Sequence, residues 1–167
     1  MRLVLASSLM MVALGGCNSG LDQQSAAKVM SSALTGTATA QAQFKPTTNN
    51  SNASFDGDIQ NPAGTGSAHV TGSAVQSSSG WDVKFDISFN QWTDLASNVT
   101  LNGALHETAS FTTMSPFVGN VAITGSLAAT GAVQSSVDFD VAVDYSPTKY
   151  DVVGHVGGAS INASVNL

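Results

Sequence analysis

The stretch WDVKFDISFN, residues 81–90, decides the fold of this chain because its apolar and polar residues alternate at every position. A period of two places all the apolar side chains on one face of an extended strand. The same pattern recurs at residues 137–145 (VDFDVAVDY) and 160–167 (SINASVNL). These segments predict half-buried strands, each with one face toward a core and the other toward water.

Turn-forming sequences separate the predicted strands. They are NPAG at residues 61–64, SSSG at 77–80, and Ser-Pro at 115–116 and 146–147. No long helical pattern follows residue 53, and parallel strands need crossovers of about a dozen residues or more, so antiparallel pairing is expected. The sequence predicts an all-β fold, either a curved antiparallel meander sheet or a small β-barrel of about seven or eight strands.

Two stretches of the chain, residues 70–87 and 123–141, resemble each other. Both begin hydrophobic-Thr-Gly-Ser, pass through Ala-Val-Gln-Ser-Ser and continue into an alternating acidic strand. A duplicated unit buries its apolar face by packing beside its copy. Glycine also recurs between apolar residues, as at Gly57, Gly103 and Gly125, where it lets a strand bend. We therefore expect an internal duplication and a curled sheet.

The N-terminal residues carry a targeting pattern. Arg2 precedes an apolar run over residues 3–14, which is shorter than the roughly 20 residues of a spanning helix. The segment LGGC at residues 14–17 resembles the bacterial lipobox. This resemblance implies cleavage before Cys17, acylation of Cys17 and anchoring in a membrane, and Asn18 in place of aspartate implies the outer membrane. The alternative is a signal peptide cut nearby that leaves Cys17 as a free thiol.

These observations divide the chain into three parts. Residues 1–16 are the predicted signal peptide, residues 17–52 a lipidated N-terminus and linker, and residues 53–167 the all-β domain. Within the linker, residues 21–34 (LDQQSAAKVMSSAL) predict a short helix with weak apolar spacing. Residues 35–54 are small and polar, which favours a flexible tether.

Charge limits the partners. The chain has 11 acidic and 5 basic residues and a net charge of −6. Nucleic-acid phosphates require clustered lysine and arginine, so the composition argues against nucleic acid as a partner. It also argues against electrostatic docking on anionic lipid. The acyl group on Cys17 is therefore the expected membrane attachment.

The polar residues do not predict a catalytic or metal site. The histidines are His69, His106 and His155. They form no HxH or HExxH spacing, and the chain contains one glutamate, Glu107, expected on the opposite strand face from its neighbour His106. Asp138, Asp140 and Asp144 share a strand face, but residues two apart are separated by about 6.6 Å, which favours a solvated face over a calcium site. We predict no catalytic residue, no metal and no cofactor.

Aromatic residues are densest in and just after the alternating segment at residues 81–90. Trp81, Phe85 and Phe89 share the inward parity and are predicted core residues. Trp92 breaks that parity and is the candidate for an exposed ligand contact.

Taken together, the sequence predicts a lipoprotein of the bacterial cell envelope with a non-catalytic β domain. The domain is expected to bind an envelope protein or a glycan, or to have a structural role. Two alternatives stay open. One is a carrier that holds a lipid or other hydrophobic ligand inside the curled sheet. The other is a hydrolase that uses a histidine with Asp138 or Asp140.

Overall fold

The computed structural model of this chain describes residues 21–43, 47–49, 52–114 and 117–166. These residues form one nine-stranded antiparallel sheet and one helix, and every strand pairs with its neighbours in the chain. The prediction of an all-β meander is confirmed. The sheet is open, with its first and last strands at opposite ends, so the barrel alternative is wrong. The predicted signal peptide and Cys17 lie outside the described residues.

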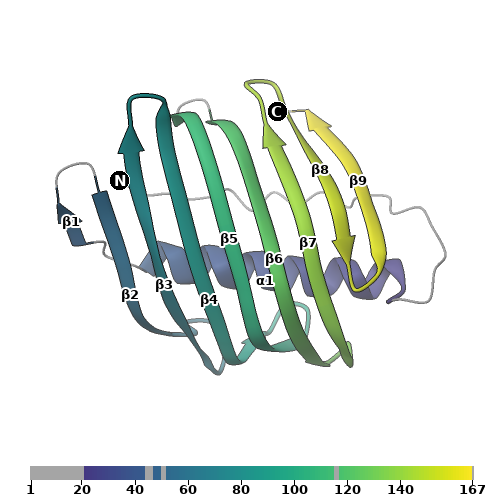
Figure 1. The fold of residues 1–167 in the computed structure, drawn as a ribbon. Helices are drawn as coiled ribbons and strands as arrows, with labels where there is room; N and C mark the ends of the chain where they lie inside the picture. The colour runs from purple at the N-terminus through teal and green to yellow at the C-terminus, as the bar shows by residue number, and fades with distance from the viewer. Residues whose placement is uncertain (1–20, 44–46, 50–51, 115–116, 167) are drawn as a thin grey trace.

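The elements follow the chain without a crossover. The helix α1 spans Gln23–Gln43. The strands are β1 (Thr47–Asn49), β2 (Asn52–Gln60), β3 (Ser67–Ser77), β4 (Gly80–Asp94), β5 (Val99–Met114), β6 (Phe117–Gly131), β7 (Ser135–Tyr145), β8 (Lys149–Val156) and β9 (Ala159–Asn166). Figure 1 shows α1 behind the sheet, running across the strands from the β9 side toward the β2 side.

The alternating pattern of the sequence separates the two faces of the sheet. On β4, Val83, Phe85 and Ile87 are no more than 5% exposed, whereas Asp82 and Asp86 are exposed. We call the side that α1 covers the inner face and the opposite side the outer face. Burial of each large apolar side chain contributes roughly 1.5–3 kcal/mol, so the inner face supplies most of the driving force for folding.

The helix is longer than the sequence predicts. It begins after Asp22, whose carboxylate accepts a hydrogen bond from the backbone N–H of Ser25 at 2.9 Å and so caps the first turn. It continues to Gln43, and strands occupy Thr47–Asn49 and the chain from Asn52, so the expectation of a flexible tether over residues 35–54 is wrong in the described part of that stretch. The buried residues lie along one side of the helix, related by steps of three or four: Ala26, Val29, Met30, Ser32, Ala33, Gly36, Thr37 and Ala40.

Small residues allow the second half of α1 to pack closely on the sheet. A Cβ atom added to Gly36 would lie 3.0 Å from Phe89 Cε1 and 3.0 Å from Trp92 Nε1. The helix backbone therefore rests almost directly on two aromatic rings. This tertiary contact explains why a stretch rich in Thr, Gly and Ala is helical, although its intrinsic helix propensity is modest.

The internal duplication is visible in the strand register. In the β3–β4 hairpin, Gly72 lies opposite Phe85, and in the β6–β7 hairpin, Gly125 lies opposite Phe139. A Cβ atom on Gly72 would lie 2.8 Å from Phe85 Cδ1. The Thr-Gly-Ser segments of the two copies thus occupy equivalent positions, each with its glycine opposite a phenylalanine, and at Gly72 the missing side chain leaves room for the facing ring.

Candidate functional site

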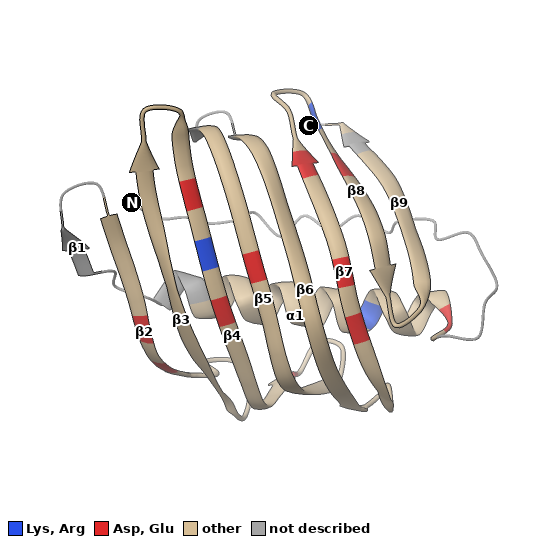
Figure 2. Cartoon of the chain, viewed as in Figure 1, with Lys and Arg blue, Asp and Glu red and all other residues tan. Residues whose placement is uncertain are grey.

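The outer face of the sheet is polar and strongly acidic. Figure 2 shows acidic positions spread over several strands from β2 to β8. Among the described residues of this face, eight aspartates stand against two lysines. The aspartates are Asp56, Asp58, Asp82, Asp86, Asp138, Asp140, Asp144 and Asp151, and the lysines are Lys84 and Lys149. The sequence predicted a solvated face for the aspartates of β7, and the outer face as a whole has the same acidic character.

One line of polar residues crosses the outer face from β2 to β9, with each member directly opposite the next. We call it the central row. Neighbouring strands are about 4.8 Å apart, so consecutive side chains of the row are within contact distance. In chain order the row is Asp56, Thr71, Asp86, His106, Thr124, Asp140, His155 and Ser160.

Each histidine lies opposite an aspartate on an adjacent strand. His106 Nδ1 lies 2.6 Å from Asp86 Oδ1, and His69 Nδ1 lies 2.9 Å from Asp58 Oδ1. His69 Nε2 lies 3.7 Å from a carboxylate oxygen of the neighbouring Asp56. His155 is in register with Asp140, one of the two aspartates that the hydrolase alternative names. These are cross-strand pairs that stabilise a sheet by tenths of a kcal/mol each.

An aspartate–histidine pair is also the orienting half of a nucleophilic triad. The next strand places Thr124 opposite His106 and Ser88 opposite His69. The described contacts include no hydrogen bond from either imidazole to that hydroxyl, and both histidine side chains are about half exposed. In the part of the chain that the structure describes, no group of three or more His, Cys, Asp or Glu residues is arranged to hold a metal ion.

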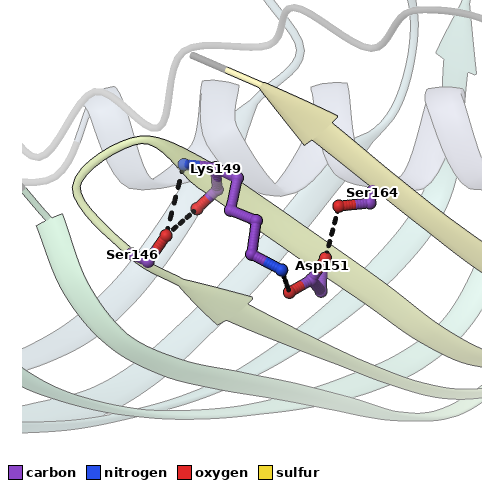
Figure 3. Close-up of polar contacts among 4 residues, drawn as sticks. All are labelled: Ser146, Lys149, Asp151 and Ser164. Carbon is purple, nitrogen blue, oxygen red and sulfur yellow. Dashed lines mark hydrogen bonds and ion pairs between the residues drawn. The ribbon is translucent and has the colours of Figure 1, made fainter.

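A small network of polar contacts lies at the edge of the acidic face, near the β7–β8 turn (Figure 3). Lys149 Nζ lies 2.7 Å from Asp151 Oδ2, and Ser164 donates to Asp151 Oδ1 at 2.5 Å. The hydrogen bond from Lys149, and then that from Ser164, hold the pKa of Asp151 below its ordinary value. Ser146 closes the turn, donating to the Lys149 carbonyl at 2.9 Å.

Trp92 is not an exposed ligand contact, so that prediction is wrong. Its side chain is 3% exposed and makes an edge contact with Phe89, with 5.8 Å between ring centroids. A β-bulge lies between these two residues, and Gln91 adopts a φ of 51° within it. The inserted residue reverses the alternation, so that Trp92 returns to the inner face.

The inner face holds a polar group that was not among the predicted site residues. Glu107 is 5% exposed and lies in register between Phe85 and Ile123. Burial, then the charge of Glu107 and then Tyr150 raise the pKa of Tyr145. Glu107 directly follows His106, so the alternation of a strand places the two side chains on opposite faces. This alternation could have predicted that Glu107 lies on the inner face.

Aromatic rings extend from this group along the inner face. The ring centroids of Phe111 and Tyr145 are 6.4 Å apart, and those of Tyr145 and Tyr150 are 5.8 Å apart. Gly119 lies in register between Phe111 and Tyr145. A Cβ atom added to Gly119 would lie 2.9 Å from Phe111 Cδ1, so the glycine leaves room for that ring. We call Glu107, Phe111, Tyr145 and Tyr150 the inner polar–aromatic group. The group combines apolar rings with a carboxylate and phenol hydroxyls.

The fold and these two surfaces define a class: an all-β protein with an open meander sheet, packed on one side by a helix and polar on the other. Comparison of the chain with protein-family models, with curated proteins and with solved structures finds no match. Among the described residues, no helix combines the length and the apolar character needed to cross a membrane.

Proposed function

We propose that this chain is an acyl-anchored lipoprotein of the bacterial envelope whose β domain binds a partner and catalyses no reaction. The anchor is the acylated Cys17, as the lipobox at residues 14–17 implies. The binding surface is the outer face of the sheet, and the partner is an envelope protein with a basic surface.

The observation that carries this proposal is that the two faces of the sheet differ in burial and in charge. The inner face packs against α1, whereas the outer face presents its polar side chains to water. Eight aspartates against two lysines make that face electrostatically complementary to a positively charged surface. Histidine–aspartate pairs that are open to water fit binding better than catalysis, which benefits from excluding water.

Neutralising part of the outer face tests the binding surface. Asp138→Asn, Asp140→Asn and Asp144→Asn together remove three charges from exposed positions on β7. We expect at least a tenfold weaker association with the partner that is cross-linked to the wild-type chain in native envelopes, and a loss of association at high salt. Lys84→Gln is the matched control on the same face and is expected to strengthen association. Unchanged cross-linking in the triple variant would contradict the proposal.

The anchor needs a separate test. Mass spectrometry of the chain purified from envelopes is expected to find residue 17 as the N-terminus, carrying acyl groups. Cys17→Ser is expected to abolish acylation and to release the folded domain into the soluble fraction. A wild-type chain with an unmodified Cys17 thiol would rule out the lipoprotein assignment but leave the outer-face test intact.

The inner polar–aromatic group favours a second candidate function, a carrier of an amphiphilic lipid. Glu107 and the three aromatic residues place a carboxylate beside apolar rings on the inner face, and an amphiphile with a polar head and an apolar tail would contact both.

Solvent extraction of the purified chain tests the carrier function. A carrier is expected to yield a stoichiometric amphiphile by mass spectrometry, and Glu107→Gln is expected to reduce its amount. Asp86→Asn, on the outer face, is the control and is expected to leave the amount unchanged. Extracts that contain only the covalent acyl groups would exclude this function.

A further inference from the structure

The open sheet ends at β9, which pairs with β8 and with no other described strand. One side of the β9 backbone therefore presents N–H and C=O groups that have no partner within the described sheet. Such an edge is a template for an additional strand unless the protein protects it with charges, proline or a bulge.

None of these protective features occurs on β9. Its sequence, ASINASVN over Ala159–Asn166, contains no charged residue and no proline. The register with β8 runs without a shift from Val156–Ala159 to Lys149–Asn166, so the strand carries no bulge. Ser160, Asn162 and Ser164 are exposed along its outer side. The edge is therefore long, regular and neutral.

The opposite edge of the sheet is protected. β1 pairs with the start of β2, over Asn52 to Ser54. Beyond that point β2 carries Asp56 and Asp58, whose side chains are 82% and 78% exposed. Two copies that met along this edge would bring four carboxylates together, and like charges opposite one another destabilise strand pairing.

We propose that β9 pairs antiparallel with β9 of a second copy of this chain, around a two-fold axis, to form one continuous sheet. The neutral edge favours a second copy because serine hydroxyls and asparagine amides both donate and accept hydrogen bonds. Identical side chains can therefore pair across the axis, as an isologous interface requires. The rest of the outer face is acidic and would repel another copy, which leaves β9 as the place of contact.

The alternation of β9 restricts the register of the pair. Ser160, Asn162 and Ser164 are exposed and Ile161 is buried, so matching faces require residues of the same parity to lie opposite each other. The greatest overlap that this parity allows then places the axis at Asn162 or at Ala163. With the axis at Asn162, this residue faces Asn162 of the other copy. With the axis at Ala163, Asn162 faces Ser164 of the other copy.

Cysteine cross-linking in native envelopes tests both the contact and its register. The wild-type chain supplies the background for any thiol at Cys17. Asn162→Cys is expected to give a disulfide-linked dimer if the axis passes through Asn162. The double variant Asn162→Cys/Ser164→Cys is expected to give the dimer in either register, because facing Cβ atoms are about 4.5–5.5 Å apart. Ala128→Cys, exposed on the outer face of β6, is the control.

A charge placed on the edge gives an independent readout. The detergent-solubilised wild-type chain is expected to have the protein mass of a dimer by light scattering. Asn162→Lys is expected to be a monomer, whereas Ala128→Lys, with the same added charge away from the edge, is expected to stay a dimer. A monomeric wild type, or cross-linking of both edge variants no greater than that of Ala128→Cys, would overturn the proposal.

Discussion

At the scale of single residues, Ser32 is the polar link between α1 and the sheet. It has no exposed surface, and its hydroxyl lies 2.9 Å from Asp94 Oδ2 and 2.7 Å from Ser97 Oγ, at the β4–β5 connection. Burial would raise the pKa of Asp94, but hydrogen bonds from Ser97 and Ser32 outweigh it and the pKa lies below the ordinary 3.8.

Ser32→Ala removes the hydroxyl that contacts Asp94, Ser97 and the Lys28 carbonyl in this buried network. We expect the free energy of unfolding to fall by about 1–2 kcal/mol at neutral pH, measured by urea denaturation. Ser136→Ala, at an exposed position, is the control and is expected to change it by less than about 0.5 kcal/mol.

The same network predicts a dependence on pH. Because the folded-state pKa of Asp94 is depressed, its stabilisation is present above pH 3.8 and is lost as the pH falls through the folded-state pKa. The difference between wild type and Ser32→Ala is therefore expected to shrink in acid. A difference that stays constant down to the lowest pH at which the chain is folded would contradict this explanation.

Tyr145 reports on the inner polar–aromatic group. Its raised pKa means that the neutral phenol is favoured in the folded state, so this contribution to stability is present below the ordinary pKa of 10.0 and is lost at higher pH. The absorbance of tyrosinate is expected to develop later for Tyr145 than for a tyrosine in water. Glu107→Gln is expected to lower the pKa partway, because the charge is lost and the burial remains. Asp138→Asn, on the outer face, is expected to have no effect.

At the scale of elements, α1 is held by shape complementarity as much as by apolar area. Its contact with the β4 aromatic rings depends on the absence of a side chain at Gly36. The buried positions of the helix are mostly alanine, valine and threonine, whose spacing continues beyond Leu34. Counting small residues as part of the apolar face would have extended the helix prediction into this stretch.

Gly36→Val tests this close contact. Valine raises helix propensity, but its branched side chain must displace Phe89 and Trp92, and overpacking of this kind costs about 1–3 kcal/mol. We expect a net loss of stability in thermal denaturation. Thr35→Val, at the adjacent exposed position, is the control and is expected to have little effect. A Gly36→Val chain as stable as the wild type would show that the contact is looser than the structure indicates.

At the scale of the whole molecule, helix and sheet share one hydrophobic core. Val29 and Ala33 of α1 are fully buried together with Val70 and Leu101 of the sheet. A domain with one core unfolds as a unit. This cooperativity distinguishes a docked helix from a tether that is helical only part of the time.

Urea unfolding followed by two probes measures that cooperativity. Far-ultraviolet circular dichroism follows secondary structure, including α1, and tryptophan fluorescence follows Trp81 and Trp92. We expect the two transitions to coincide. A helical signal that disappears at lower urea than the fluorescence change would mean that α1 undocks independently.

The sequence by itself determined the strands, their antiparallel order, the duplication and the acidic outer face. These properties depend on a period of two and on short turns, which are local features of the chain. Particular residues agree closely: Asp138, Asp140 and Asp144 are exposed, and His106 and Glu107 occupy opposite faces.

The tertiary structure alone decided the features that depend on distant contacts. A bulge turned Trp92 inward, the aromatic rings of β4 ordered the second half of α1, and the sheet remained open rather than closing on itself. Each outcome depends on packing between residues far apart in the chain. Local periodicity carries no information about such packing, because the competing arrangements satisfy the same pattern of apolar and polar residues.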